Sequence, residues 1–201
     1  VLDLREGVVL SSPNLACLEG QALAAQVRAE LPEPVPVILE NDANAAAYGE
    51  AWAGAGRNVN SLILMTLGTG IGGGIVLDGR IWHGAHGFAG ELGHVSIFAD
   101  GLPCPCGNRG CVEVYASGSA QQRRFREAVL AGRPSTLAEA VRAGHAVTGR
   151  DISLAARAGD ALARENEEET GRFLGMAAAN MAHIFDPEMI CFAGGMTHAG
   201  Q

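Results

Sequence analysis

Residues 61–74 read Ser61-Leu62-Ile63-Leu64-Met65-Thr66-Leu67-Gly68-Thr69-Gly70-Ile71-Gly72-Gly73-Gly74. The first seven residues form an apolar run of strand length, which glycines interrupt from Gly68 onward. Two further strand-like segments, 74–77 and 80–82, flank Asp78-Gly79, a pair typical of a tight hairpin turn. This stretch therefore predicts a strand, a glycine-rich loop over 68–74, and a hairpin.

The glycine-rich loop has the composition of a phosphate-binding loop. Glycines allow backbone N–H groups to point at anionic oxygens, and the Thr69 hydroxyl adds one more donor. A dinucleotide-binding fingerprint would need a helix after the glycines, whereas an apolar strand follows here. A β-hairpin that clasps phosphate fits better, and a tight turn that binds nothing is the alternative.

Residues upstream of this stretch predict alternating strands and helices. We expect a short strand over 8–10 and a helix over 21–31. A run of prolines then excludes helix, and residues 35–39 predict a buried strand. Asn41 and Asp42 suit a helix N-terminus, so an Ala-rich helix should extend from there to about Ala53.

Residues downstream add a helical insertion to this α/β pattern. Residues 83–112 are rich in Gly and Cys and predict irregular structure. Four helices are expected after them, over 113–130, 136–144, 151–165 and 166–185, and then a strand over Met189–Ala193. The order of elements predicts an α/β fold with a helical insertion.

Composition excludes several classes of protein. The chain has 201 residues, a net charge of −8 and 14 cationic residues, all of them arginine. Without lysine there is no Walker A lysine, protein-kinase strand lysine or Schiff base. The acidic balance argues against nucleic acid as the default partner, and no apolar run approaches the roughly 20 residues of a membrane span.

Both ends of the chain resemble points at which a longer protein has been cut. The chain begins at Val1 without an initiator Met or a signal core. It ends soon after a strand-like run and a glycine turn, where an α/β fold would normally continue into a helix. We therefore expect both termini to be cut and the protein to be cytoplasmic.

The cysteines predict a structural zinc site. His94 precedes a Cys-x-Cys-x4-Cys cluster formed by Cys104, Cys106 and Cys111. Three thiolates and one imidazole are the ligand set of a closed four-coordinate zinc site. Free thiols or disulfides are the alternatives, although two cysteines separated by one residue rarely bridge each other. Cys17 and Cys191 stand alone and predict small buried apolar side chains.

Asp42 follows the predicted strand at the edge of the sheet where ligands of open α/β folds bind. It is either a carboxylate that caps the next helix or a general base that acts on an alcohol. Glu91, His94 and Glu113 add polar groups around the loop that zinc would hold. Several carboxylates and an Asn suit a ligand with many hydroxyl groups.

These motifs resemble the ROK family of sugar kinases and repressors, which has the actin-like/hexokinase (ribonuclease H-like) ATPase fold. The resemblance covers nearly the whole chain and is carried by Glu40-Asn41-Asp42-Ala43-Asn44, Leu67–Gly74 with its Gly-Thr-Gly turn, Gly90-Glu91-Leu92-Gly93-His94, the segment from Cys104 to Glu113, and Ala193-Gly194-Gly195. Two departures stand out. The N-terminal Asp-x-Gly-Gly-Thr phosphate hairpin of family kinases is absent, and Pro105 stands where Gly is common.

The resemblance implies a role for each motif. Asp42 would be the catalytic base, and His94 would serve both sugar and zinc. The residues that would hold the sugar are Asn41, Glu91, His94 and Glu113. Those that would hold ATP are Gly68, Thr69, Gly70 and Gly72 at the phosphates and Gly194 and Gly195 on the adenosine side. Cys104, Cys106 and Cys111 would complete the metal site.

The resemblance also implies domains, cofactors and activity. Residues 1–41 would be the remnant of a small N-terminal domain, and 42–201 most of a larger C-terminal ATPase-fold domain with the zinc-pinned loop 83–113. The expected reaction is ATP-dependent phosphorylation of a hexose, most simply glucose, at the 6-hydroxyl, with Mg²⁺ and structural Zn²⁺.

Two kinds of alternative function stay open, and the resemblance also implies properties of the full-length protein. A sugar-responsive repressor with an upstream helix-turn-helix is one alternative, and an N-acetylhexosamine kinase, mannokinase or fructokinase of the same family is another. Only that helix-turn-helix would bring nucleic acid as a partner. We expect the full-length protein to be a homodimer and this chain alone not to be fully active.

Overall fold

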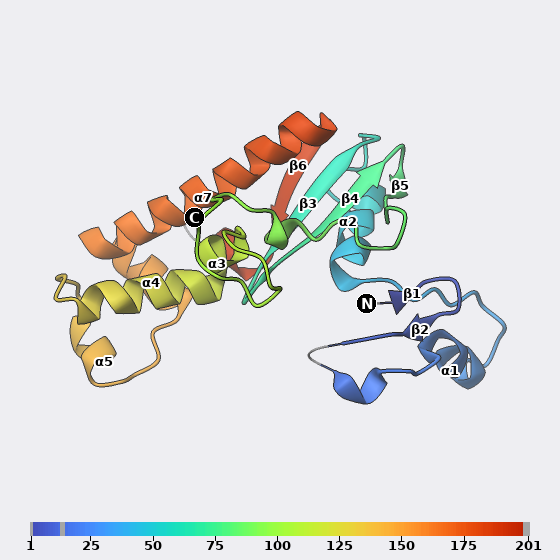
Figure 1. The fold of residues 1–201 in the computed structure, drawn as a ribbon, viewed down its shortest axis with the longest axis horizontal. Helices are drawn as coiled ribbons and strands as arrows, with labels where there is room; N and C mark the ends of the chain where they lie inside the picture. Colours follow the sequence, from blue (N-terminus) through green and yellow to red (C-terminus); the bar gives the residue numbers. More distant parts are fainter. Residues whose placement is uncertain (1, 13–14, 199–201) are drawn as a thin grey trace.

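The computed structural model describes residues 2–12 and 15–198, which form an α/β structure (Figure 1). The strands are β1 Leu2–Asp3, β2 Val8–Val9, β3 Leu62–Leu67, β4 Ile71–Leu77, β5 Arg80–Ile81 and β6 Met189–Ala193. The α-helices are α1 Leu23–Glu30, α2 Asp42–Ala53, α3 Glu113–Ala116, α4 Gly118–Leu130, α5 Ala138–Arg142, α6 Gly149–Arg157 and α7 Ala161–Phe185. Short 3-10 helices occur at Ala16–Leu18, Leu92–His94 and Gly195–His198.

The main sheet has four strands in the order β5-β4-β3-β6. β3 pairs antiparallel with β4 and parallel with β6. Because successive side chains of a strand point to opposite faces, Leu62 and Leu64 pack with Ala47 of α2, while Ile63 and Met65 pack in the cluster that contains α7. The predicted strand 61–67 is thereby confirmed to within one residue, as the buried centre of the sheet.

The glycines of β4 correct one expectation. The predicted loop over 68–74 is wrong in its second half, because β4 begins at Ile71 and pairs with β3 through Gly72, Gly73 and Gly74. A Cβ on Gly74 would lie 2.6 Å from the Cβ of Ala47, and one on Gly73 would lie 2.5 Å from Leu92 Cγ. These glycines therefore let α2 and the loop 83–112 pack closely against the sheet, and only residues 68–70 form the turn.

A second core lies in the helical region formed by α4, α5, α6 and the start of α7. Its buried side chains include Phe125, Val129, Val141, Ile152 and Leu162. Figure 1 shows this region extending to one side of the sheet, below the N-terminal half of α7. The sheet end of the chain and the helical end are therefore supported by different apolar clusters.

Two helix boundaries differ from the expectation. The helix expected over 113–130 is divided at Ser117, whose extended backbone ends α3 and whose hydroxyl accepts from Ala120 N to cap α4. The helices expected over 151–165 and 166–185 are α6 and α7, separated by Gly159 in the left-handed region. Asp160 caps α7 by accepting from Ala163 N. Local capping side chains thus decide where these helices begin.

The N-terminal residues form a small unit of β1, β2 and α1 that lies apart from the main sheet (Figure 1). The expected buried strand over 35–39 is wrong: no strand is assigned there, Val35 is 46% exposed and Ile38 is 82% exposed. Pro34 and Pro36 remove donors that a strand ladder needs. Cys17 is exposed and Cys191 is half-buried, so the expectation of two buried cysteines is also wrong. The boundary at 41/42 stays a prediction.

Within residues 2–12 and 15–198 no helix combines the length and the apolar character that a membrane crossing requires.

Candidate functional site

Asn41 and Asp42 lie where the chain enters α2. The Asn41 side chain occupies the N-cap and accepts from Ala43 N at 2.9 Å and from Asn44 N at 3.2 Å. Asp42 is the first helical residue, is exposed, and accepts from Ala43 N at 2.9 Å. Asn41 therefore has the capping role that was one of the two alternatives for Asp42. The Asp42 carboxylate stays exposed at the helix N-terminus, where negative charge is favourable.

Asn41, Asp42 and Glu91 line one cavity of about 130 Å³, which we call the α2 cavity. Gly72 and Gly73 of β4 also line it. The structure thus brings together three of the expected sugar-binding and catalytic residues. His94 and Glu113 are not among its lining residues: His94 Nδ1 lies 3.6 Å from Cys104 Sγ, and Glu113 Oε2 accepts from Ile71 N at 2.8 Å. The sugar-binding roles of these two residues stay predictions.

Glu40 and His83 also line the α2 cavity, and no role was predicted for either side chain. Glu40 Oε2 lies 2.7 Å from His83 Nε2, while Glu40 Oε1 accepts from Asn41 N at 2.9 Å and Asn44 Nδ2 at 3.1 Å. Glu40 therefore ties the start of α2 to the chain that leaves β5. The position of Glu40 next to Asn41 could have indicated this role. His83 is 43 residues from Glu40 in sequence, so the sequence contained no signal for their contact.

The expected metal ligands converge in the irregular loop. The ligand atoms of His94, Cys104, Cys106 and Cys111 all lie within 4.8 Å of one another. Gly107 and Gly110 adopt positive φ angles of 91° and 73°, which lets the chain turn sharply between the cysteines. A Cβ on Gly110 would also collide with the backbone oxygen of Phe98. These two glycines therefore allow the bends that bring the ligands together.

Two of the distances between these ligand atoms match the edges of a tetrahedral zinc site. Zn–S bonds of about 2.3 Å and Zn–N bonds of about 2.05 Å give S···S edges of about 3.8 Å and S···N edges of about 3.6 Å. The Cys106 and Cys111 sulfurs lie 3.7 Å apart, and Cys104 Sγ lies 3.6 Å from His94 Nδ1. Burial, reinforced by Cys104 and Cys106, raises the pKa of the Cys111 thiol to about 12, so its thiolate needs a neighbouring cation.

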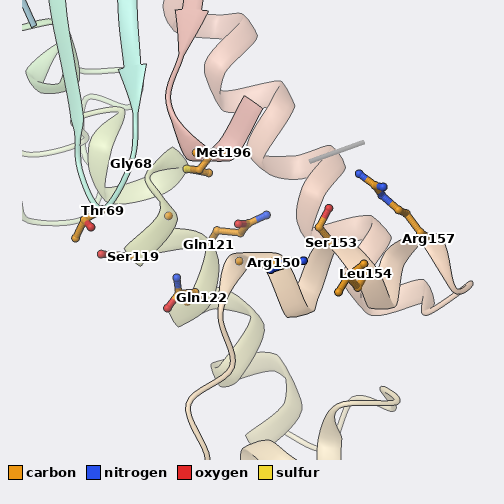
Figure 2. Close-up of a pocket in the computed structure, with 13 residues that line it drawn as sticks. Gly68, Thr69, Ser119, Gln121, Gln122, Arg150, Ser153, Leu154, Arg157 and Met196 are labelled. Atoms are coloured by element: carbon orange, nitrogen blue, oxygen red, sulfur yellow. The ribbon is translucent and has the colours of Figure 1, made fainter. Parts of the chain in front are cut away.

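A second, larger cavity lies on the other side of the β3–β4 turn, and we call it the α6 cavity (Figure 2). Its volume is about 750 Å³. Gly68 and Thr69 of the turn, Gly195, and residues of α4 and α6 line it. It therefore brings together three of the expected ATP-binding residues.

The other expected ATP-binding glycines lie outside the lining of the α6 cavity. Gly72 lines the α2 cavity instead, and Gly70 faces the Glu113 carboxylate, which would lie 2.5 Å from a Cβ. Gly194 has a φ of 109°, and a Cβ there would lie 2.3 Å from Leu67 O. The structure thus gives Gly70 and Gly194 packing reasons to be glycine, and the nucleotide contacts of all three glycines stay predictions.

The α6 cavity is lined by positively charged side chains that were not predicted from the sequence. Arg150 and Arg157 of α6 line it, and among its described lining residues none is acidic. The two arginines are seven residues apart, or about two helical turns, so they share one face of α6. Figure 2 shows Arg157 across the cavity from Thr69, with Gln121, Arg150 and Ser153 between them. This lining favours an anionic ligand, and nothing in the sequence distinguishes these arginines from other surface arginines.

One turn connects the two cavities. The tip of the β3–β4 hairpin, Gly68 and Thr69, lines the α6 cavity, while Gly72 and Gly73 a few residues later line the α2 cavity with Asp42. A phosphate held at the hairpin tip would thus lie next to the β4 glycines that line the α2 cavity, which also contains the Asp42 carboxylate. The arrangement suits transfer of a group from a ligand in one cavity to a ligand in the other.

Comparison with known proteins gives consistent matches. The model of the ROK family matches residues 2–201. The glucokinase of Halalkalibacterium halodurans is 44% identical over 167 residues, which are 83% of this chain and 51% of that protein. The chain spans between 51% and 63% of the length of the first curated glucokinases that it matches.

Solved structures show the same likeness. The ROK glucokinase of Streptomyces griseus, solved with glucose and AMPPNP, has a TM-score of 0.80 at 37% identity, over 98% of this chain and 63% of that chain. A ROK transcriptional regulator, a homolog of the E. coli MLC protein, has a TM-score of 0.87 at 36% identity, over 98% of this chain and 48% of that chain. These likenesses confirm the expected actin-like/hexokinase α/β fold.

Proposed function

The chain belongs to the ROK family, and from this premise we propose that it is part of a glucokinase, which transfers the γ-phosphoryl group of ATP to the 6-hydroxyl of glucose. The glucokinase relatives and the complex of one of them with glucose and an ATP analogue support this assignment. The observation that carries it is the β3–β4 hairpin shared by the two cavities, with Asp42 in one and an arginine-lined wall in the other. In this proposal residues 42–201 form most of the larger domain, and 1–41 remain from the smaller one.

The proposed reaction assigns a task to each cavity. Glucose occupies the α2 cavity, where Asp42 accepts the proton of the 6-hydroxyl as its oxygen bonds to the γ-phosphorus. The bond between that phosphorus and the bridging oxygen breaks, and ADP leaves. Asn41 and Glu91 orient the sugar, together with His94 and Glu113 as the family resemblance implies. Catalysis is then mainly positioning and stabilisation of charge.

The α6 cavity would hold ATP in the same proposal. Gly68, Thr69 and the arginines of α6 would contact its phosphates, and Gly195 would lie on the adenosine side. Mg²⁺ bound with the nucleotide would supply further positive charge. The proposed role of zinc is architectural, since four protein ligands leave no open position for water. A homodimer in the cytoplasm is part of this proposal.

A regulator that binds sugar is the second candidate, because a ROK transcriptional regulator has a TM-score of 0.87 to this chain. The exposed carboxylate of Asp42 favours the kinase, since a sensor needs no base. Formation of glucose 6-phosphate and ADP by the full-length protein tests the choice. We expect turnover with glucose, whereas glucose binding without any turnover would favour the regulator.

The choice of glucose is tested by a panel of hexoses. Asp42 and Glu91 accept hydrogen bonds from ring hydroxyls that glucose shares with related sugars, and Asn41 Nδ2 donates to such hydroxyls, so specificity has to come from the shape of the cavity. We expect the highest kcat/KM with glucose. A kcat/KM about tenfold higher for N-acetylglucosamine, N-acetylmannosamine, mannose or fructose, equal to about 1.4 kcal/mol of transition-state preference, would assign the protein to that sugar instead.

A further inference from the structure

We propose that Glu113 is a positioning residue for the nucleotide, because its carboxylate fixes the β3–β4 turn that lines the α6 cavity. Ile71 N donates to Glu113 Oε2 at 2.8 Å. Ile71 is 5% exposed, so loss of this carboxylate would leave a buried amide without its partner. This inference rests on the proposed function only in taking the ligand of the α6 cavity to be a nucleotide.

The segment that begins with Glu113 holds the turn at two further points. Gly118 N donates to Gly68 O at 2.8 Å, and Ser119 N donates to Thr69 O at 3.4 Å. A Cβ on Gly118 would lie 2.8 Å from Gly68 O, so the backbones of the turn and of α4 are in close contact. Three successive contacts therefore define the conformation of residues 68–71.

The glycine at position 70 has a specific reason in this arrangement. A Cβ on Gly70 would lie 2.5 Å from Glu113 Oε2. Gly70 has no positive φ that would call for glycine, and it is not among the residues that line the α6 cavity. Position 70 therefore requires glycine, because a side chain there would occupy the space of the Glu113 carboxylate.

Glu113 acts on the nucleotide through the turn and not by contact. Gly68 and Thr69 line the α6 cavity (Figure 2), whereas Glu113 is not among its lining residues. A carboxylate in that cavity would repel phosphates. Placed on the far side of the turn instead, it holds the backbone of residues 68–71 without facing the phosphates. The role requires a hydrogen-bond acceptor at position 113 and does not require a charge.

The test measures the dissociation constant of ADP for the full-length protein in the absence of sugar. Glu113→Ala should raise this constant by about fivefold, the scale of one lost hydrogen bond. Glu113→Gln keeps an acceptor oxygen at the same position and should stay within about twofold of the wild type. Equal ADP affinity of Glu113→Ala and wild type, or equal loss in the Ala and Gln variants, would overturn the inference.

A double-mutant cycle with Gly70 gives an independent test. Gly70→Ala should weaken ADP binding in the wild type by displacing the Glu113 carboxylate, but it should change binding by less than about twofold in the Glu113→Ala background, where that space is free. The same factor in both backgrounds would overturn the inference. If Glu113→Ala fails to unfold cooperatively, Gly70→Ala is compared in the wild type and in Glu113→Gln, and weaker ADP binding in both is the expected result. A wild-type protein without affinity for ADP would contradict the proposed function itself.

Discussion

Arg150 and Arg157 are the positively charged residues of the α6 cavity in a chain that has no lysine. Both side chains line the α6 cavity from one face of α6, and none of the described residues that line this cavity is acidic. Thr69 and the backbone amides of the turn are the groups that the sequence predicted for phosphate contact. The structure adds the arginines as the charged part of this wall.

Replacement of Arg150 tests its contribution. Arg150→Gln removes one charge and keeps donor groups, so we expect the KM for ATP to rise by about three- to tenfold, with the KM for glucose unchanged. Arg142→Gln, at an exposed position at the end of α5, is the matched control and should leave both constants unchanged. Steady-state kinetics with each substrate varied decide, and an unchanged KM for ATP in Arg150→Gln would show that the arginine does not contact the nucleotide.

Residues differ in how far the sequence could predict their roles. The four metal ligands could be predicted because zinc needs particular atoms, which His94 and the three cysteines supply within a short segment. Arg150 and His83 could not, because their positions depend on which distant elements pack beside them. Glu113 is an intermediate case: its importance was predicted, but its contact with Ile71 depends on the fold.

Among the elements, α7 depends on a buried cap at its N-terminus. The Asp160 side chain accepts from Ser135 Oγ at 2.7 Å, from Thr136 N at 2.7 Å, from Thr136 Oγ1 at 2.8 Å and from Ala163 N at 3.0 Å. Burial alone would raise the pKa of Asp160, but these hydrogen bonds outweigh it and lower the pKa to about 2 from its ordinary 3.8. Asp160 therefore stabilises the fold as an anion.

Asp160→Asn should lower the free energy of unfolding by about 1–3 kcal/mol at pH 7. Because the pKa is lower in the folded state, this stabilisation is present above pH 3.8 and is lost as the pH falls toward 2. Urea unfolding of both proteins at pH 7 and at several lower pH values measures it, with Asp100→Asn at an exposed loop position as the control. A difference that does not shrink toward low pH would contradict the assigned role.

Two strands of the main sheet, β3 and β6, were predictable because each is a short apolar run next to glycine. The apolar run before Gly68 predicted β3, and Met189–Ala193 was predicted as a strand with its observed bounds. The segment 35–39 has similar apolar residues but contains Pro36, and its Val35 and Ile38 are exposed, so apolar character alone gave a wrong prediction. The division at Ser117 and the start of α7 depend on single capping side chains, which periodicity does not detect.

At the scale of the whole molecule, the cluster of His94, Cys104, Cys106 and Cys111 belongs to the loop 83–113, which packs against the sheet through buried apolar side chains. Val112 N donates to Val95 O at 2.9 Å, and Val112 is buried in the main apolar cluster beside Leu92. A zinc ion bound by the four ligands would hold this loop and, with it, Glu91 in the α2 cavity. Metal loss should therefore affect the sugar site before it unfolds the core.

Elemental analysis of metal-replete protein should find about one zinc per chain. Cys106→Ser should lower this content, while Cys17→Ser, at an exposed cysteine outside the cluster, should not. Removal of zinc with a chelator should raise the KM for glucose while the thermal unfolding transition persists. Less than about 0.5 zinc per chain in the wild type would contradict the zinc assignment.

The proposed kinase depends on the relation of two cavities across one hairpin, and Asp42 is the residue whose chemistry distinguishes a kinase from a sugar sensor. Asp42→Asn keeps the size and hydrogen-bonding capacity of the side chain but removes the base. Asp78→Asn is the matched control, since Asp78 is exposed at the β4–β5 turn with a φ of 52°, a conformation that Asn also adopts.

The most direct measurement is therefore the kcat of Asp42→Asn with glucose and ATP in the full-length protein, together with its glucose dissociation constant. The proposed reaction predicts a fall in kcat of at least about 10²-fold, a glucose affinity within a few-fold of the wild type, and an Asp78→Asn control with wild-type kcat. A kcat for Asp42→Asn equal to that of the wild type would contradict the assignment of Asp42 as the catalytic base.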